Sequence, residues 1–410
     1  MATKNNIPTG YKDSAVGIIP QEWEVATLGK LGKVISGLTY SPDDISDTGI
    51  LVLRSSNIHN GMLCMADNVY VNTVSYNPVK TGDILICVRN GSKNLIGKSA
   101  YITPHYEGAA FGAFMSIYRS ANNNYLKHLF NSDIFYKNVH RNLGATINSI
   151  NGNDLKKFVI PVPPLAEQRK IAEILGVWDE AIEKQSRLIE KLELRKRALM
   201  QRLLTGRTRL PGFTAPWQKC LYSDILKEVK RTMTWDDNEE YDLISVKRRS
   251  GGLFHRDRLL GKDIKTKNLR PAKCGDFLIS KMQIVHGASG LVTEEFDEMK
   301  ISGSYIALVA INGDMVDMKF INWYSKTPYF YHQTYVSSYG VHIEKMTFDL
   351  ESFMSMNIML PPFPEQKAIV AVLTTADDEI ATHRKKLDAL RLQKRGLMQQ
   401  LLTGKTRVKI

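Results

Sequence analysis

The chain has 410 residues, an apolar fraction of 43%, a charged fraction of 24% and a formal net charge of +13. This composition is typical of a folded protein and excludes disordered and collagen-like classes, while the length suits two domains rather than one core. No apolar run approaches membrane-spanning length and residues 1–6 lack the apolar core of a signal peptide, so we expect a cytoplasmic protein.

The cysteines and the charge limit the classes of ligand. Cys64, Cys87, Cys220 and Cys274 form no CxxC pair, which argues against a zinc knuckle and a disulfide framework. The net charge is +4 in residues 1–160, +2 in 161–206, +2 in 207–360 and +5 in 361–410. This even spread favours an extended surface laid along a nucleic acid, and the alternative on charge alone is a merely basic soluble protein.

Residues 1–160 are predicted to form a mixed α/β domain with short β-rich runs such as 84–88. Trp23 near its start is interpreted as a core anchor. Two polar loops supply candidate nucleic-acid contacts, because their residue types pair with base edges and phosphates, although each residue alone could be ordinary surface. These candidates are Arg54, Ser55, Ser56 and Asn57, followed by Arg89, Asn90, Ser92, Lys93 and Asn94.

A long repeat follows this block. Residues 163–209 recur 198 positions later as 361–407, with 21 identities over 47 positions. Each copy begins with Pro-Pro and ends near a glycine, Gly206 or Gly404, where a left-handed C-cap is wanted. We therefore predict one long helix within 161–206 and another within 361–410, each of about 40 residues and roughly 60 Å.

Both copies carry an apolar seam with alternating steps of four and three residues, which is the pattern of a coiled coil. The simplest partner of each helix is the other, in an antiparallel pair with pseudo-two-fold symmetry, although the sequence does not exclude a parallel pair. The apolar seam positions are Ile171, Leu175, Trp178, Ile182, Ile189, Leu192, Leu199 and Leu203 in the first copy, and Ile369, Leu373, Ile380, Leu387, Leu390, Leu397 and Leu401 in the second.

Polar residues interrupt the seam at equivalent positions of the two copies. Gln185 corresponds to His383, and Lys196 corresponds to Lys394. A polar seam residue commonly fixes helix register, so His383 is interpreted as structural rather than as a metal ligand or a catalytic residue. Basic clusters lie toward the helix C-termini and acids lie nearer the starts, a distribution that complements the helix dipole.

Residues 207–360 are predicted to form a second mixed α/β domain, with Trp217 as a core anchor near its start. It matches residues 1–160 only at landmarks, so the scaffold is shared and the surface is not. The stretch 247–273 has eleven basic side chains, counting His255, against two acids, which predicts a phosphate-facing surface. The candidate nucleic-acid contacts of this block are Lys247, Arg248, Arg249, Arg256, Arg258, Lys281, Gln283 and His286.

Motifs for catalysis are missing from the sequence. There is no GxxxxGK[ST] phosphate loop, no glycine-rich dinucleotide turn, and no Asn-Pro-Pro-Tyr or Asp-Pro-Pro-Tyr run of the kind that grips a flipped adenine. We therefore expect a binding protein that has no catalytic or metal site. The alternatives are a stand-alone DNA-binding regulator, a structural scaffold, and an enzyme whose site has no recognisable motif.

The order of these parts resembles the specificity subunit of type I restriction-modification enzymes across essentially the whole chain. The resemblance rests on two Pro-Pro-x-x-Glu-Gln helices that end in Leu-Leu-Thr-Gly, each preceded by a variable block, and on the run 49–58. It implies two target recognition domains, 1–160 and 207–360, that each read one half of a bipartite duplex DNA target, with the helices as an antiparallel spacer. Because the two blocks barely align, we predict an asymmetric target whose half-sites are separated by unread bases.

The resemblance also implies partners for the chain. In that family two methylation subunits bring S-adenosylmethionine and modify adenines, and two motor-nuclease subunits hydrolyse ATP with Mg²⁺. None of these cofactors is expected to bind this chain. The methylation subunits are expected to dock against the helices and the recognition domains.

Overall fold

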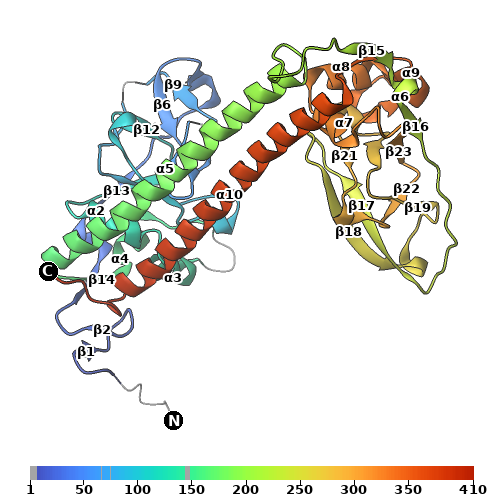
Figure 1. Cartoon of the computed structure of the whole chain (residues 1–410). Helices are drawn as coiled ribbons and strands as arrows, with labels where there is room; N and C mark the ends of the chain where they lie inside the picture. The colour runs from blue at the N-terminus through green and yellow to red at the C-terminus, as the bar shows by residue number, and fades with distance from the viewer. Residues whose placement is uncertain (1–6, 66, 74, 144–147) are drawn as a thin grey trace. The chain divides into compact units, whose positions relative to one another are not determined.

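The computed structural model describes residues 7–65, 67–73, 75–143 and 148–410 (Figure 1). The chain divides into two compact units. Unit 1 comprises Met1–Ser186 and Lys385–Ile410, and unit 2 comprises Arg187–Arg384. Two long helices, α5 (Leu165–Leu203) and α10 (Phe363–Leu401), each contribute one half to either unit. The predicted parts, 1–160, 161–206, 207–360 and 361–410, divide the chain at other positions, and these boundaries stay a prediction.

Unit 1 is built on two four-stranded sheets, with short helices α1 (Leu28–Leu31), α2 (Asn123–Leu129), α3 (Asp133–Asn142) and α4 (Gly152–Lys157). The first sheet is antiparallel, in the order β11 (Ser99–Tyr101), β10 (Ile84–Cys87), β13 (Met115–Arg119), β4 (Lys33–Ser36). The second has the order β12 (Ala110–Phe111), β6 (Ile50–Leu53), β9 (Val69–Val71), β5 (Ile45–Ser46), and β12 runs parallel to β6. Three short pairs complete the unit: β1 (Tyr11–Lys12) with β2 (Ile19–Pro20), β3 (Glu24–Thr27) with β14 (Val159–Val162), and β7 (Ile58–His59) with β8 (Met62–Leu63).

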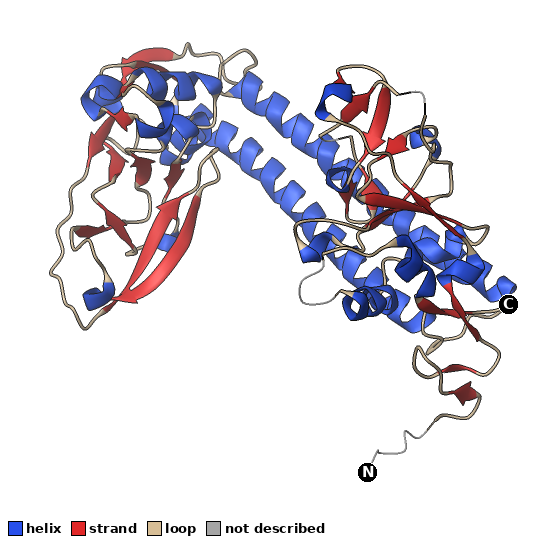
Figure 2. Ribbon diagram, turned by 180° about the vertical axis from the view of Figure 1, so that it is seen from behind, coloured by secondary structure: helices blue, strands red, loops and turns tan. Residues whose placement is uncertain are grey.

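Unit 2 repeats this plan with helices α6 (Tyr222–Ile225), α7 (Met318–Tyr324), α8 (Pro328–Val336) and α9 (Leu350–Met354). Its antiparallel sheet has the order β16 (Leu226–Glu228), β23 (Tyr305–Ala310), β20 (Phe277–Ser280), β21 (Ser289–Leu291). Its second sheet has the order β18 (Leu253–Leu260), β17 (Glu240–Val246), β22 (Lys300–Ser302), β19 (Leu269–Pro271), and β17 runs parallel to β22. Strand β15 (Gln218–Leu221) pairs with β26 (Asn357–Leu360), and β24 (Ser338–Tyr339) with β25 (Thr347–Phe348). Figure 2 shows strands and helices together in both units, as predicted.

The buried strands β10 and β20 explain the unbroken apolar runs in the sequence. Side chains alternate between the two faces of a strand, so each of these strands supplies two cores. Ile84 and Ile86 of β10 pack into the core that includes α5, while Leu85 and Cys87 pack into a second core with Leu53. In β20, Phe277 and Ile279 join the helix-side core, and Leu278 joins the other.

The long helices have 39 residues each, close to the predicted length. Gly206 and Gly404 have φ of 68° and 72°, the left-handed conformation expected beyond a helix C-terminus. The apolar seam positions are buried except for four half-buried ones, Trp178, Leu199, Leu390 and Leu397. The seam is therefore an inward-facing stripe, and knobs-into-holes packing along it stays a prediction.

Ion pairs within each unit show that the two helices run antiparallel. In unit 1, Lys394 of α10 binds Asp179 of α5. In unit 2, Lys196 of α5 binds Asp377 of α10, and Arg384 binds Glu193 at 2.5 Å. Lys196 and Lys394 thus reach acids on the facing helix, so complementing the helix dipole was an incomplete explanation of the charge distribution.

The repeated Glu-Gln pair organises the start of each long helix. Gln168 donates to the carbonyl of Pro163 at 2.8 Å, and Gln366 makes the same bond to Pro361. The carboxylate of Glu167 is fully buried, accepts from the indole of Trp23 at 2.8 Å, and receives two hydrogen bonds from Arg407. We name this Trp–Glu–Arg group the clasp, and unit 2 contains an equivalent clasp.

In the clasp of unit 2, Glu365 is likewise fully buried and binds Trp217 at 3.1 Å and Arg209 at 2.6 and 2.7 Å. The hydrogen bonds to the glutamates raise the pKa of both Arg209 and Arg407. Trp23 is a core anchor as predicted, and Trp217 is half-buried and packs against the core of unit 2. Across the residues described, no helix is long and apolar enough to cross a membrane.

Candidate functional site

The first candidate loop of unit 1 follows strand β6. Asn57 accepts the backbone N–H of Arg54 at 2.9 Å and donates to the carbonyl of Cys64 at 3.3 Å. Asn57 has no exposed surface, so it shapes the loop and is withdrawn from the predicted DNA contacts. Arg54 forms an ion pair with Asp67 at 2.7 Å, while Ser55 and Ser56 are half-buried.

The second candidate loop of unit 1 follows strand β10 and lies against the first. Asn90 donates to the hydroxyl of Ser55 at 3.2 Å, and the ammonium of Lys98 donates to the Ser55 carbonyl at 3.3 Å. Ser92, Lys93 and Asn94 lie at the exposed end of this loop. The fold thus brings the two candidate loops together, although Ser55 and Asn90 are 35 residues apart in the sequence.

An aromatic side chain that sequence reasoning missed extends this surface. Phe114 is 57% exposed, and the guanidinium carbon of Arg89 lies 5.3 Å from the centre of its ring. The backbone N–H of Arg89 also donates to the Phe114 carbonyl at 3.1 Å. A planar cation over a ring is a common surface for base or phosphate contact. We name the exposed parts of residues 54–56 and 89–94, with Phe114, the unit 1 face.

In unit 2 the corresponding turn follows β17 and rests on the loop after β20. Arg249 and Ser250 have φ of 58° and 53°, and their backbone N–H groups donate to the carbonyls of His286 and Gly287 at 2.6 and 2.9 Å. The hydroxyl of Ser250 lies 2.8 Å from that of Tyr331. A Cβ on Gly287 would lie 1.8 Å from the Tyr331 oxygen, so glycine is required for this close approach.

Four predicted contacts of unit 2, Arg248, Arg249, Gln283 and His286, meet on this surface. The guanidinium of Arg248 donates to Gln283 at 2.5 Å and to Glu344 at 2.9 Å. His286 Nε2 lies 3.3 Å from the same Glu344 carboxylate. Glu344 was not predicted, because it stands 96 residues from Arg248 and lies in a hairpin that brings it back to the loop after β20. We name Arg248, Arg249, Gln283, His286 and Glu344 the unit 2 face.

The remaining predicted contacts of unit 2 lie outside this cluster. Lys247 is exposed, 5.3 Å from the ring centre of Phe254, and Lys281 is half-buried with its carbonyl bonded to Phe348. Arg256 and Arg258 are exposed on the edge strand β18, where they pair with Asp257 and Glu240 at 3.0 and 2.9 Å.

The structure corrects the charge count for residues 247–273. Acids from outside the stretch pair with several of its basic side chains: Asp237 binds Lys267, Glu240 binds Arg258, Glu298 binds Lys273, and Asp242 forms a hydrogen bond with His255. The count of eleven basic side chains against two acids therefore overstated the positive charge of this surface. Exposed ion pairs contribute only about 0–1 kcal/mol, so such cations can still exchange an acid for a phosphate.

The two faces occupy the same place in their folds. Strand β6 of unit 1 and strand β17 of unit 2 each run parallel to a neighbouring strand. In each unit, the segment after this strand packs on the segment after the buried central strand, which is β10 in unit 1 and β20 in unit 2. The side chains differ between units, with Ser55, Asn90 and Arg89 in one and Arg248, Gln283 and His286 in the other. One scaffold therefore presents two different donor sets.

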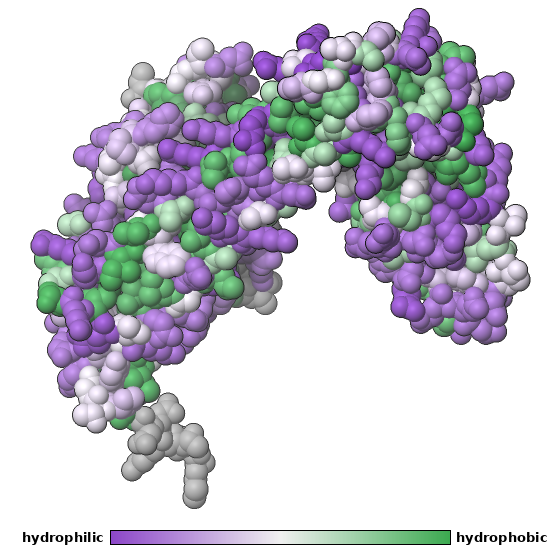
Figure 3. All heavy atoms as spheres, viewed as in Figure 1, coloured by the Kyte–Doolittle hydropathy of each residue, from purple (hydrophilic) through white to green (hydrophobic). Residues whose placement is uncertain are grey.

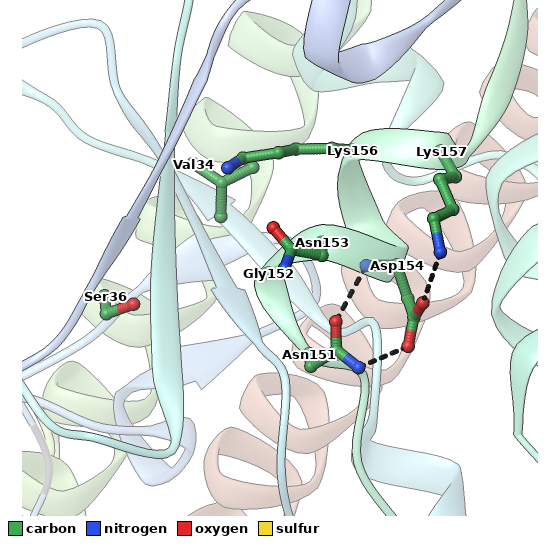
Figure 4. A pocket seen from close by; sticks show the side chains of 8 residues that line it. All are labelled: Val34, Ser36, Asn151, Gly152, Asn153, Asp154, Lys156 and Lys157. Carbon is green, nitrogen blue, oxygen red and sulfur yellow. Dashed lines mark hydrogen bonds and ion pairs between the residues drawn. The ribbon is translucent and has the colours of Figure 1, made fainter.

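A polar depression of unit 1 lies outside the two faces. This open depression has a volume of about 510 Å³. Figure 4 shows that Asn151, Asp154 and Lys157 in its lining bind one another. Asn151 accepts the N–H of Asp154 at 2.8 Å as the N-cap of α4, and Lys157 pairs with Asp154 at 3.3 Å. Within the described ranges no group of three or more His, Cys, Asp or Glu could hold a metal.

Comparisons with known proteins identify relatives along nearly the whole chain. The family model for the type I restriction modification DNA specificity domain matches residues 20–194 and 223–392. A putative type I restriction enzyme MjaX specificity subunit of Methanocaldococcus jannaschii is 27% identical, covering 97% of each chain. The StySPI specificity subunit of Salmonella potsdam is 25% identical over 86% of this chain and 82% of its own.

Solved structures share the fold. The S subunit of a type I restriction-modification system from M. genitalium superposes with a TM-score of 0.56 at 14% identity, covering 98% of each chain. A chain from a study of complex assembly and conformational transition of the type I R-M system gives 0.57 at 17% identity, covering 95% of this chain and 99% of its own.

Proposed function

The chain belongs to the type I restriction modification DNA specificity domain family, and from this premise we propose that it is the DNA-reading subunit of a type I restriction-modification complex. Each unit reads one half of a bipartite duplex target through its face, and the chain itself carries no catalytic site. The observation that carries this proposal is the recurrence of one loop arrangement with different side chains. Two unlike faces on one scaffold favour two unlike half-sites and hence an asymmetric target.

The chemistry of the faces suits readout of base edges. Arginine pairs with guanine and the side-chain amides of Asn and Gln pair with adenine in the major groove, while flanking cations contact phosphates. Unit 2 offers Arg248 and Gln283 side by side, and unit 1 offers Arg89 beside Asn90. Both pairs are anchored by neighbouring loops, which lowers the entropic cost of ordering them on DNA.

The long helices carry features that suit partner docking. Leu194 and Leu392 occupy the same position of the repeat and are 58% and 69% exposed, outside the buried seam. Figure 3 shows apolar side chains gathered over the first half of α5, where Val177 is 63% exposed. We propose that two methylation subunits dock on these helices in the cytoplasm and bring S-adenosylmethionine, and that two motor-nuclease subunits bring ATP and Mg²⁺ chemistry.

Selection of duplexes from a random library tests this proposal. The chain, purified with its methylation subunits, is expected to enrich one asymmetric motif made of two short specified parts separated by unspecified bases. The chain without partners serves as the comparison. Enrichment of a full motif by the chain alone would favour a stand-alone regulator, and absence of any sequence preference in both samples would favour a scaffold; either result contradicts the proposal.

A further inference from the structure

A hairpin of unit 2 carries large apolar side chains into solvent. Tyr339 at the end of β24 is 66% exposed, and Val341 and Ile343 in the connection to β25 are 95% and 50% exposed. Single exposed apolar residues are common, but three within five positions on one projecting turn indicate an interaction surface. We name residues 340–344 the hairpin tip.

The hairpin tip is held in one conformation by its base. Phe348 of β25 is buried, with its ring centre 5.4 Å from that of Phe353. Gly340 has φ of 149°, and a Cβ there would lie 3.0 Å from the Cα of Met346, so only glycine fits where the chain turns outward. The backbone N–H of Lys345 closes the turn on the carbonyl of His342 at 2.8 Å.

The hairpin tip is continuous with the unit 2 face. The N–H of Phe348 donates to the carbonyl of Lys281 at 2.9 Å, which joins the hairpin to the loop after β20. Glu344 at the end of the tip accepts from Arg248 at 2.9 Å and lies 3.3 Å from His286. A ligand bound on the unit 2 face therefore meets the hairpin tip at the edge of that face.

Charge and shape favour DNA over a protein as the occupant. Glu344 of the tip faces the basic side chains Arg248 and His286, and Lys345 follows it in the chain. The edge of a base pair in the major groove displays one apolar group, the C5-methyl of thymine, among hydrogen-bonding atoms. Val341 is the most exposed of the three apolar residues, and it stands three positions before Glu344, the partner of Arg248, so it can supply an apolar contact near Arg248 and Gln283.

We propose that Val341 contacts the C5-methyl of a thymine in the half-site read by unit 2, next to the bases contacted by Arg248 and Gln283. Glu344 orients Arg248 for this readout. The inference rests on the proposed function and adds a specificity-determining residue to it. It also requires at least one thymine, on either strand, within that half-site or in the base pairs flanking it.

The test is a double-mutant cycle that removes the thymine methyl group from the DNA and truncates the Val341 side chain of the protein. The assembly with methylation subunits is titrated with the selected duplex and with duplexes in which one thymine at a time is replaced by deoxyuridine. One replacement is expected to weaken binding of the native chain by about fourfold, which corresponds to about 0.8 kcal/mol for one buried methyl group. Val341→Ala should weaken binding to the thymine duplex by a similar factor and abolish sensitivity to that replacement.

The control is Ile311→Ala, because Ile311 is 48% exposed and its backbone pairs with Ile225 rather than with these loops. This variant should retain sensitivity to deoxyuridine. Retained sensitivity in Val341→Ala, insensitivity of the native chain to every replacement, or loss of assembly with the methylation subunits in Val341→Ala each overturns the inference. The proposed function survives these results as long as the native assembly still selects its bipartite target.

Discussion

Arg407 binds the buried carboxylate of Glu167 through two hydrogen bonds, Nε to Oε1 at 2.9 Å and Nη2 to Oε2 at 3.1 Å. The segment that follows α10 is thereby tied to the start of α5, and Arg209 ties the segment after α5 to Glu365 at the start of α10 in the same way. The repeated Pro-Pro-x-x-Glu-Gln motif and the arginine that follows Leu-Leu-Thr-Gly are therefore two halves of one structural device.

Removal of the arginine is expected to destabilise unit 1. Arg407→Ala leaves Glu167 buried without its cation, which costs about 3 kcal/mol in the free energy of unfolding. Arg407→Lys should lie between this variant and the native chain, because it keeps the charge and loses the paired geometry. Urea denaturation measures the effect, with the exposed Arg395→Ala as the control. Equal midpoints for the two alanine variants would exclude a stabilising clasp.

A charge exchange tests the antiparallel register in unit 2. Arg384→Glu places two acids together at Glu193 and should lower the free energy of unfolding by about 0.5–1 kcal/mol. Adding Glu193→Arg restores the pair and most of the stability. The coupling energy from the double-mutant cycle should shrink in high salt, because the pair is exposed. Zero coupling at low salt would mean that the two side chains do not meet.

The stability of unit 1 should depend on His128. This imidazole is buried on α2, with Nδ1 3.6 Å from Asp179 and with Lys127 and Lys394 nearby. Burial, reinforced by the two lysines, holds the pKa of His128 well below its usual range. The unfolded chain therefore binds a proton near pH 6.5 that the folded unit does not bind, and stability falls as the pH drops below that value.

The expected loss is at most about 1.4 kcal/mol per pH unit below 6.5 for this one group. Unfolding free energies measured at pH 7.5 and 5.5 should differ less in His128→Gln than in the native chain. His140→Gln on the exposed side of α3 is the matched control and should keep the native difference. A native-like pH dependence in His128→Gln would show that other groups cause it.

The long helices and the mixed α/β units were predictable because their signals are local. Heptad spacing, the prolines at one end and Gly206 at the other predict a helix without reference to the rest of the chain. The clasp was not predictable, because Glu167 meets a cation 240 positions away. Asn57 was misassigned since its residue type suits both a base contact and a loop-shaping bond, and burial alone distinguishes these roles.

The predicted charge of the unit 2 surface was wrong for a related reason. Counting charges along 247–273 omits acids such as Glu240 and Asp242, which lie on β17 and become neighbours of β18 only when the sheet forms. The predicted loop 89–94, by contrast, follows the β-rich run 84–88 that the sequence identifies, which corresponds to β10. Which atoms of these loops meet DNA stays a prediction.

Salt dependence distinguishes free from neutralised cations. Arg249→Ala should weaken DNA binding and reduce the slope of log affinity against log salt by about 1, as expected for one phosphate contact. Arg258→Ala is the comparison, because Glu240 already neutralises that guanidinium at 2.9 Å, and its slope should change less. Fluorescence anisotropy over a series of salt concentrations measures both. Identical slopes in both variants and the native assembly would remove Arg249 from the phosphate contacts.

The central claim is that each unit reads its own half of one asymmetric target. Long-read mapping of modified adenines in cells that carry the chain and its methylation subunits tests it most directly, with Arg89→Ala and Arg248→Ala as matched variants, one for each face. The native chain should give a two-part asymmetric motif, and each variant should relax or shift only the half read by its own unit. A palindromic motif, or variants that alter both halves alike, would contradict the account.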